Sequence, residues 1–308
     1  MNTVLSSEVF GEYEYTVTDV NSSNIVNMGS FKNVITINGV NLLMASRGDG
    51  GVPMYCSIGT GTSSFTENST GLTAGVYNNA SIPSTGVTTV TISGVKYSKH
   101  TITWNFSALS TTYDISEVAA YLNNNPYFTS SYLFSIARIT DSSGNPTSIH
   151  LLGSDTPTPQ QLTLSYSFYV RKIPAGTSLG TGSISVNSVP INYNILTTSE
   201  RDLLNWPNPG NDNNDCQAFD VSDVLQSYGP ANFSGTFYPI PTVNPKEFSW
   251  SYSANISPGV LTCTFRYLIL WNGDKIVFDA DITKSSIQRM QFTITKSLTV
   301  DNTSISIV

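Results

Sequence analysis

The glycine-rich stretch at residues 56–72, CSIGTGTSSFTENSTGL, holds residue types found in nucleotide-binding loops. A dinucleotide fingerprint needs Gly-x-Gly-x-x-Gly between a strand and a helix. Gly59 and Gly61 supply the first two glycines, but Ser64 takes the third place, and the polar residues that follow have no apolar stripe. We therefore interpret the stretch as a tight turn whose glycines adopt positive φ. No cofactor is expected.

General-base chemistry would depend on two histidines, His100 and His150. A Ser-His-Asp hydrolase or a metal-dependent hydrolase would have to use one of them. His100 stands at the start of a predicted strand, and neither residue belongs to a G-x-S-x-G or H-E-x-x-H motif. Both histidines are therefore expected to have ordinary structural surroundings.

Two pairs of carboxylates have the spacing that a glycosidase could use, Asp114 with Glu117 and Asp279 with Asp281. Asp279 and Asp281 would share one face of a strand, because side chains alternate along it. Solvated charges on a strand face show the same spacing. We favour that interpretation and predict that the chain is not an enzyme.

Metal ligands are also scarce in the sequence. The loop NPGNDNNDC presents Asp212 and Asp215 among amide oxygens, but it lacks the order of ligands and glycine of a calcium-binding EF-hand. Cys56, Cys216 and Cys263 have no CxxC spacing, which argues against a zinc site or a disulfide framework. We expect buried free thiols and no bound metal.

Binding residues are not identified by any motif. The triplet RGD at residues 47–49 continues into the glycine-rich sequence GGVP and is interpreted as part of a loop. Aromatic residues in turn-rich stretches of the second half could stack on sugars or anchor a protein interface, although a core position is the more common one. These are Trp206, Tyr228, Phe237, Tyr238, Trp250 and Tyr252.

The elements that would position these residues are strands, because apolar and polar residues alternate with period two. Residues 161–170, QLTLSYSFYV, show the pattern most clearly, and it recurs at 261–271 and 290–298. Turn residues separate further short runs. The sequence therefore predicts an all-β fold of two antiparallel β-sandwich domains, jelly-roll or immunoglobulin-like. A few short helices are predicted at residues 114–122, 197–207 and 219–229.

A domain boundary is predicted where the stretch KIPAGTSLGTG, residues 172–182, follows a strongly alternating strand. The expected domains are residues 1–172, which include the Gly-Thr-Gly-Thr turn, and residues 184–308. Both halves end in a polar loop followed by an alternating strand, so an internal duplication is an open alternative.

Composition limits the classes of partner. Charged residues make up 11% of the 308 residues, and the formal net charge is −7. No Lys/Arg cluster is present, so nucleic-acid binding is not expected. No apolar run reaches the length of a membrane span, and the N-terminal residues do not resemble a signal peptide.

Several segments in a fixed order resemble tail-fibre and tail-associated virion proteins of tailed bacteriophages. The first is KNVITINGV at residues 32–40, with Val34 where the family usually has leucine. The second is the Gly-Thr-Gly-Thr turn at residues 59–62 and the polar run that closes on Leu72. Segments 113–124 and 132–172 are similar to the strands that follow, with Ala119 where glycine is common. The resemblance covers roughly residues 30–172.

This resemblance implies a structural virion protein of the tail, baseplate, neck or collar, or a fibre adaptor, assembled in the host cytoplasm. It implies attachment to the particle through residues 1–172, and outward or inter-subunit contacts through residues 184–308. Other virion proteins and a homo-oligomer, a trimer or a six-fold ring, are the expected partners. A module that binds a host receptor or surface glycan is the alternative function.

Overall fold

The computed structural model of the chain describes residues 8–39, 53–79, 84–122, 132–186, 188–202, 214–241, 247–270 and 274–300. Contacts divide these residues into two units, 8–170 together with Val300, and 171–299. The division falls within strand β12 (Gln160–Ile173). The boundary predicted from the sequence, residues 172–184, begins one residue after Arg171, the first residue of the second unit.

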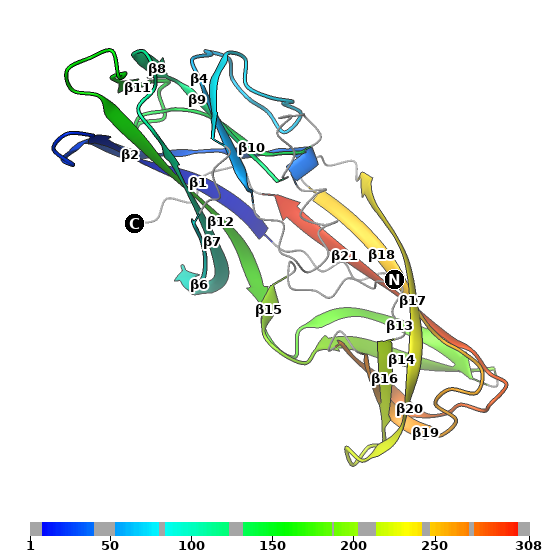
Figure 1. Ribbon diagram of the computed structural model, residues 1–308. Coiled ribbons are helices and arrows are strands. Elements are labelled where there is room, and N and C mark those ends of the chain that lie inside the picture. The colour runs from blue at the N-terminus through cyan, green and yellow to red at the C-terminus, as the bar shows by residue number, and fades with distance from the viewer. Residues whose placement is uncertain are drawn as a thin grey trace. The chain divides into compact units, whose positions relative to one another are not determined.

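The first unit contains a sheet in the order β2-β1-β12-β7-β6 (Figure 1). Its further strands are β1 (Glu8–Asp19), β2 (Ile25–Lys32), β6 (Ser84–Ile92) and β7 (Val95–Phe106). Strands β1 and β12 pair antiparallel over their whole shared length, with Tyr13 opposite Tyr166. This sheet confirms the antiparallel pairing that the alternation predicts.

A second sheet of the same unit has the order β3-β10-β9-β4-β5. Its strands are β3 (Val34–Ile35), β4 (Tyr55–Gly59), β5 (Gly75–Asn79), β9 (Glu117–Tyr121) and β10 (Leu133–Arg138). Two short strands, β8 (Tyr113–Ile115) and β11 (Ile149–Leu151), pair with each other.

Side chains from the two sheets meet in a common core. The Tyr13 and Ser135 hydroxyls lie 2.8 Å apart. The ring of Phe134 on β10 meets the edge of Tyr166 on β12, with centroids 5.9 Å apart. Buried Trp104 donates its indole N–H to the Met54 carbonyl at 3.2 Å. The unit is therefore a β-sandwich, with aromatic rings filling much of the space between the sheets.

The alternation within β12 is confirmed on its inner face, where Leu162, Leu164, Tyr166, Phe168 and Val170 are all buried. On the opposite face, which the pattern predicts to be exposed, part of the surface is also buried. There Tyr169 is buried because the ring of Phe10 stacks on it at 4.6 Å and Tyr97 packs beside them. A small aromatic cluster therefore covers part of the outer face of this sheet.

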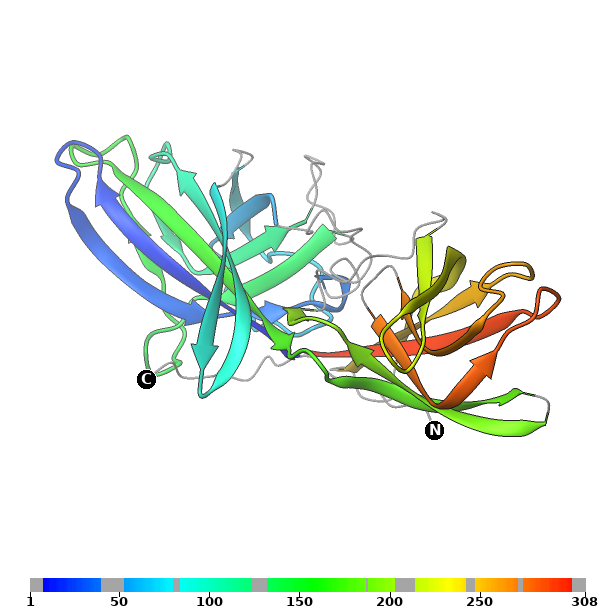
Figure 2. The same ribbon diagram turned by 90° about the horizontal axis from the view of Figure 1, so that it is seen from below.

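The second unit holds strands in the antiparallel order β13-β14-β20-β19-β16-β17-β18-β21 (Figure 2). These are β13 (Ser178–Val186), β14 (Val189–Thr197), β16 (Asn214–Phe219), β17 (Leu225–Pro241), β18 (Glu247–Ile256), β19 (Thr264–Leu270), β20 (Asp274–Thr283) and β21 (Met290–Val300). Strand β15 (Arg201–Asp202) pairs with the end of β12. In the core of the second unit the rings of Phe265 and Phe278 meet edge to face, with centroids 5.9 Å apart.

The predicted short helices are wrong wherever the structure describes them. Residues 114–122 contain β8 and β9, and residues 219–229 contain the end of β16, a turn and the start of β17. Residues 197–202 contain the end of β14 and β15, and the rest of the third segment lies outside the described residues. Strand β9 is buried on both faces, so it lacks the alternation that identifies an exposed strand. Described helical residues are limited to 37–39 and Tyr132.

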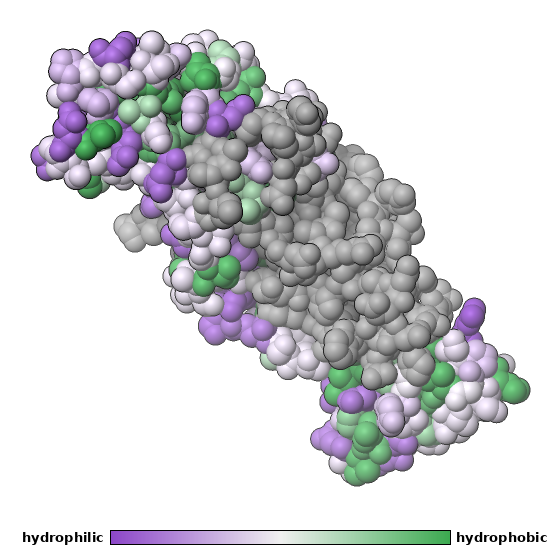
Figure 3. All heavy atoms as spheres, in the orientation of Figure 1, coloured by the Kyte–Doolittle hydropathy of each residue, from purple (hydrophilic) through white to green (hydrophobic). Residues whose placement is uncertain are grey.

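The described residues on the face seen in Figure 3 are mostly of intermediate hydropathy. In Figure 3 the coloured atoms are largely pale, with purple and green residues scattered among them. No helix in the described part of the chain is long and apolar enough to span a membrane.

Candidate functional site

The Gly-Thr-Gly-Thr turn is held by the buried carboxylate of Glu117 on β9. Oε2 of Glu117 accepts hydrogen bonds from the Thr73 backbone N–H at 3.1 Å and the Thr73 hydroxyl at 2.8 Å. Oε1 accepts one from the Ala74 N–H at 2.7 Å. The carboxylate thus joins the end of the polar run to the strand beside the turn. We call residues 59–74 together with Glu117 the carboxylate clasp.

The glycines of the turn are needed for space rather than for positive φ. The described glycines with positive φ are Gly94, Gly144, Gly176 and Gly259, so the positive φ predicted for Gly59 and Gly61 is wrong. A methyl group on Gly59 would stand 2.5 Å from Glu117 Oε1 and 2.6 Å from the Ala74 carbonyl oxygen. A side chain there would displace the carboxylate.

The carbonyl of Gly61 is held from the other side. It accepts hydrogen bonds from the Ser116 hydroxyl at 2.7 Å and from Nη1 of Arg138. Nη1 of Arg138 also donates to the Ser116 carbonyl at 3.1 Å. Leu72 packs against the cluster that contains Tyr121 and Leu133, which confirms that the polar run returns to the core. The polar groups of the clasp therefore serve its own loop.

The two histidines have different environments. His100 is buried, and its ring stacks on Phe168 with centroids 4.6 Å apart. Nδ1 of His150 on β11 lies 2.8 Å from Oδ1 of Asp114 on β8, and the two side chains are 62% and 68% exposed. The pair is thus largely in water, where such a contact adds about 0–1 kcal/mol to stability.

In each candidate carboxylate pair, the two side chains bind different partners. Asp114 contacts His150, whereas Glu117 belongs to the carboxylate clasp. Asp279 accepts from the backbone and side-chain N–H groups of Asn192 at 3.0 and 2.7 Å. Asp281 accepts from Nε of Arg266 at 2.9 Å. Each carboxylate thus has a hydrogen-bonding role in its own part of the fold.

The three cysteines differ in how deeply they are buried. Cys56 and Cys216 are buried free thiols, as predicted, while Cys263 is only partly buried. Burial raises the pKa of Cys216 to about 12 and that of Cys56 well above its ordinary value. Among the described residues, no three His, Cys, Asp or Glu side chains come together as metal ligands. Asp212 and the side chain of Asp215 lie outside the described part.

Lys284 is a buried cation that the sequence analysis did not single out. Its Nζ donates to the carbonyls of Ser257 at 3.1 Å and Val260 at 2.5 Å, across the turn that follows β18. Burial lowers the pKa of Lys284. The contacts give this lysine a structural role in holding the turn, and nothing in its local sequence, DITKSS, signals it.

Of the six aromatic residues proposed as contact residues, one has a side chain that the structure describes. Tyr228 is 70% exposed and is therefore a surface residue. Trp206 lies outside the described residues, as does the RGD triplet at 47–49. The side chains of Phe237, Tyr238, Trp250 and Tyr252 also lie outside them.

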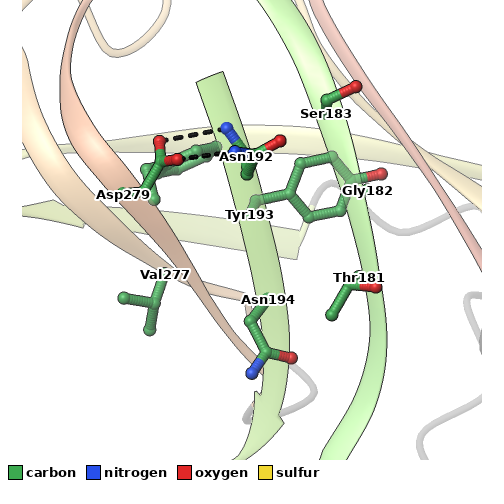
Figure 4. A pocket seen from close by; sticks show the side chains of 9 residues that line it. Thr181, Gly182, Ser183, Asn192, Tyr193, Asn194, Val277 and Asp279 are labelled. Carbon is green, nitrogen blue, oxygen red and sulfur yellow. Dashed lines mark hydrogen bonds between the residues drawn. The ribbon is translucent and has the colours of Figure 1, made fainter. Parts of the chain in front are cut away.

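A shallow hollow of about 590 Å³ lies over β13, β14 and β20 (Figure 4). Strand register arranges six of its side chains, five of them polar, in two rows, because directly opposite residues share a face. One row contains Thr181, Asn194 and Val277, and the other contains Ser183, Asn192 and Asp279. We call these six residues the polar grid.

The polar grid offers amides, hydroxyls and a carboxylate side by side. Asp279 holds the Asn192 amide, and Ser178 donates to Oδ1 of Asn194 at 2.6 Å. In Figure 4 the Tyr193 ring extends toward Gly182, where a methyl group would meet it. Such a surface can exchange hydrogen bonds with a polyhydroxylated ligand. Asn192 and Asn194 stand two apart in INYNIL, but their neighbours become evident only once the strands are paired.

Comparison of the chain with protein-family models, curated proteins and solved structures gave no match.

Proposed function

We propose that the chain is a structural component of a tailed-phage particle and acts by protein–protein assembly. The observation that supports this most is where the resembling segments lie. Asn33–Ile35, the Gly-Thr-Gly-Thr turn, Glu117–Tyr121 and Leu133–Arg138 occupy or adjoin the neighbouring strands β3, β4, β9 and β10 of one sheet. Segments that resemble virion proteins one by one are thus parts of a single packed module.

The chemistry of that module supports a role in assembly. Buried Glu117 and Ser116, together with half-buried Arg138, are engaged in holding a loop. A chain with only 11% charged residues and many serine, threonine and asparagine residues suits a component that packs against many copies of itself and other proteins. We therefore assign the unit at residues 8–170 to particle attachment, and residues 171–299 to outward or inter-subunit contacts.

This proposal places the protein in the virion, at the tail, baseplate, neck or collar, after assembly in the host cytoplasm. Its partners are other virion proteins and further copies of the chain, in a trimer or a six-fold ring. Mass spectrometry of density-purified particles tests this directly. The expected result is the chain at a stoichiometry of several copies per particle, retained after high-salt washing. Particles that lack the chain would overturn the proposal.

A second function, binding of a host surface glycan, is favoured by the polar grid. Planar amides and hydroxyls match sugar hydroxyls, and the volume of the hollow, about 590 Å³, is typical of ligand pockets. A glycan array read with the purified protein, followed by Asn192→Ala and Asn194→Ala, tests this function. Asn68→Ala, at an exposed asparagine of the first unit, is the control. Binding that both grid variants retain would exclude the hollow.

A further inference from the structure

Strand β6 is an edge strand with no protection against pairing. It pairs with β7 residue by residue, from Ser84 opposite Thr103 to Ile92 opposite Val95, without a bulge. Its sequence STGVTTVTI contains no charged residue and no proline. No described strand pairs with its other side. β6 lies at the margin of its sheet in Figure 1, and Figure 2 shows the β6–β7 hairpin in cyan.

Edge strands in monomeric proteins are usually protected by charges, prolines, bulges or shortness. Other edges of this protein show such features. Strand β2 ends in Lys32 and pairs with β1 through an irregularity beside Val17, and β13 pairs with β14 through one beside Ser178. The nine residues of β6 have none of these features. Their regular, exposed edge is suited to receive a further strand.

The turn of the hairpin indicates which backbone groups face that edge. Ser93 and Gly94 have φ of 50° and 81°, as in a two-residue type I′ turn. Ile92 and Val95 beside this turn then exchange hydrogen bonds, and bonding alternates along the strand. The N–H and C=O groups of Thr85, Val87, Thr89 and Thr91 therefore point away from β7, toward the open edge.

The side chains at this edge leave apolar surface in water. Val87 lies opposite His100, whose ring is buried in the core face of the sheet, yet Val87 itself is 62% exposed. The core face thus continues to the margin of the sheet, where part of it is uncovered. A strand added beside β6 would cover Val87 on that face.

We infer that β6 pairs antiparallel with β6 of a second copy of this chain, with Val87 facing Val87 near a two-fold axis. Antiparallel self-pairing brings the side chain nearest the two-fold axis against its own copy, so a charge at that position would be repelled by its counterpart. β6 carries no charge, which makes it compatible with its own copy. Opposed β-branched residues are favourable cross-strand pairs. The inference rests on the proposed assembly function; because a two-fold contact joins identical surfaces, it would link two trimers or two rings rather than neighbours within one.

Charge variants of the full-length protein test the inference. Analytical ultracentrifugation of the purified wild type should show concentration-dependent dimers. Val87→Lys and Val87→Glu should each weaken dimerisation about tenfold or more, since like charges then face each other and the valine contact is lost. An equimolar mixture of the two variants should restore association, because lysine then faces glutamate. Val26→Lys, the same change at a half-exposed valine of β2, should leave dimerisation unchanged.

Single cysteines test the geometry. In an antiparallel two-fold pair only the position nearest the axis meets its own copy, so Val87→Cys should cross-link under mild oxidation far more than Thr85→Cys or Thr91→Cys. Ser143→Cys, in an exposed turn, gives the background level. Circular dichroism of each variant checks that the fold is retained.

A monomeric wild type, equal association of the Lys, Glu and mixed samples, or cross-linking no greater at Val87 than at Ser143 would each overturn the inference. These measurements use the isolated protein and are independent of virion membership. A dimer formed through β6 by a protein absent from particles would refute the proposed function alone. A particle protein that is monomeric in isolation would refute only the β6 contact.

Discussion

The α-carbon of Gly59 lies against the carboxylate of Glu117, leaving no room for a methyl group between them. Gly59 ends strand β4, and Glu117 begins strand β9, directly opposite it in the register of the two strands. The small residue and the buried acid are thus parts of one arrangement. Neither residue can be exchanged without affecting the loop that both hold.

Gly59→Ala should destabilise the protein by about 1–3 kcal/mol, because the new methyl group would press on Glu117 and on the Ala74 carbonyl. Gly71→Ala in the same loop is the matched control, since nothing lies within 4 Å of the position of its methyl group. Its effect should stay within about 0.5 kcal/mol. Urea unfolding followed by circular dichroism measures both, and equal effects would contradict the role given to Gly59.

Glu117→Ala should cost about 2–4 kcal/mol, since it leaves the N–H groups of Thr73 and Ala74 and the Thr73 hydroxyl without their acceptor. Glu117→Gln should cost less, because one amide oxygen remains. Glu14→Gln, at an exposed position on β1, is the control for loss of a charge. Hydrogen exchange should be faster at Thr73 and Ala74 in the Glu117 variants. Unchanged protection there would show that the clasp does not hold the loop.

The hydroxyl contact between the sheets should appear as coupling between Tyr13→Phe and Ser135→Ala. The two oxygens are buried and 2.8 Å apart, so each single substitution leaves the other hydroxyl with a weakened network. A double-mutant cycle in unfolding free energy should give a coupling of about 0.5–1.5 kcal/mol. Additive effects of the two substitutions would mean that the contact contributes nothing to stability.

Alkaline pH should lower the free energy of unfolding of the protein. Burial raises the pKa of Cys216 and of Tyr121 each to about 12, from ordinary values of 9.0 and 10.0. These groups ionise more readily in the unfolded chain. Their contribution is fully present below about pH 9 and declines as pH rises through 9 to 12.

Thermal unfolding midpoints measured between pH 7 and pH 11 should therefore fall at the alkaline end. Cys216→Ala should reduce the steepness of this fall, because one ionisable group is removed. Cys263→Ala should change the steepness of this fall less, since that thiol is only partly buried. A midpoint that stays constant to pH 11 would contradict the expected dependence.

The sequence predicted the all-β fold and the faces of the exposed strands well, because alternation records which side of a strand meets the core. The inner face of β12 from Leu162 to Val170 is an example. The same rule failed for β9, where residues 117–121 are buried on both faces and an apolar run can suggest a helix. Burial on two sides leaves no periodic signal.

The site features depended on contacts between distant residues and could not be predicted in the same way. The glycines of the turn were identified, but the reason for them, a carboxylate from a strand more than fifty residues later, is visible only in three dimensions. The polar grid likewise depends on the register that places Asn192 beside Ser183 and Asp279. The sequence around a single serine, asparagine or aspartate does not indicate which residues will lie beside it on neighbouring strands.

Pairs of hydroxyl groups join β7 to β12, between Thr101 and Ser167 at 3.2 Å and between Thr103 and Ser165 at 2.9 Å. Dissolved ions screen contacts between full charges, whereas they affect hydrogen bonds between neutral groups far less. These contacts between β7 and β12 should consequently depend much less on ionic strength than ion pairs in the same places would.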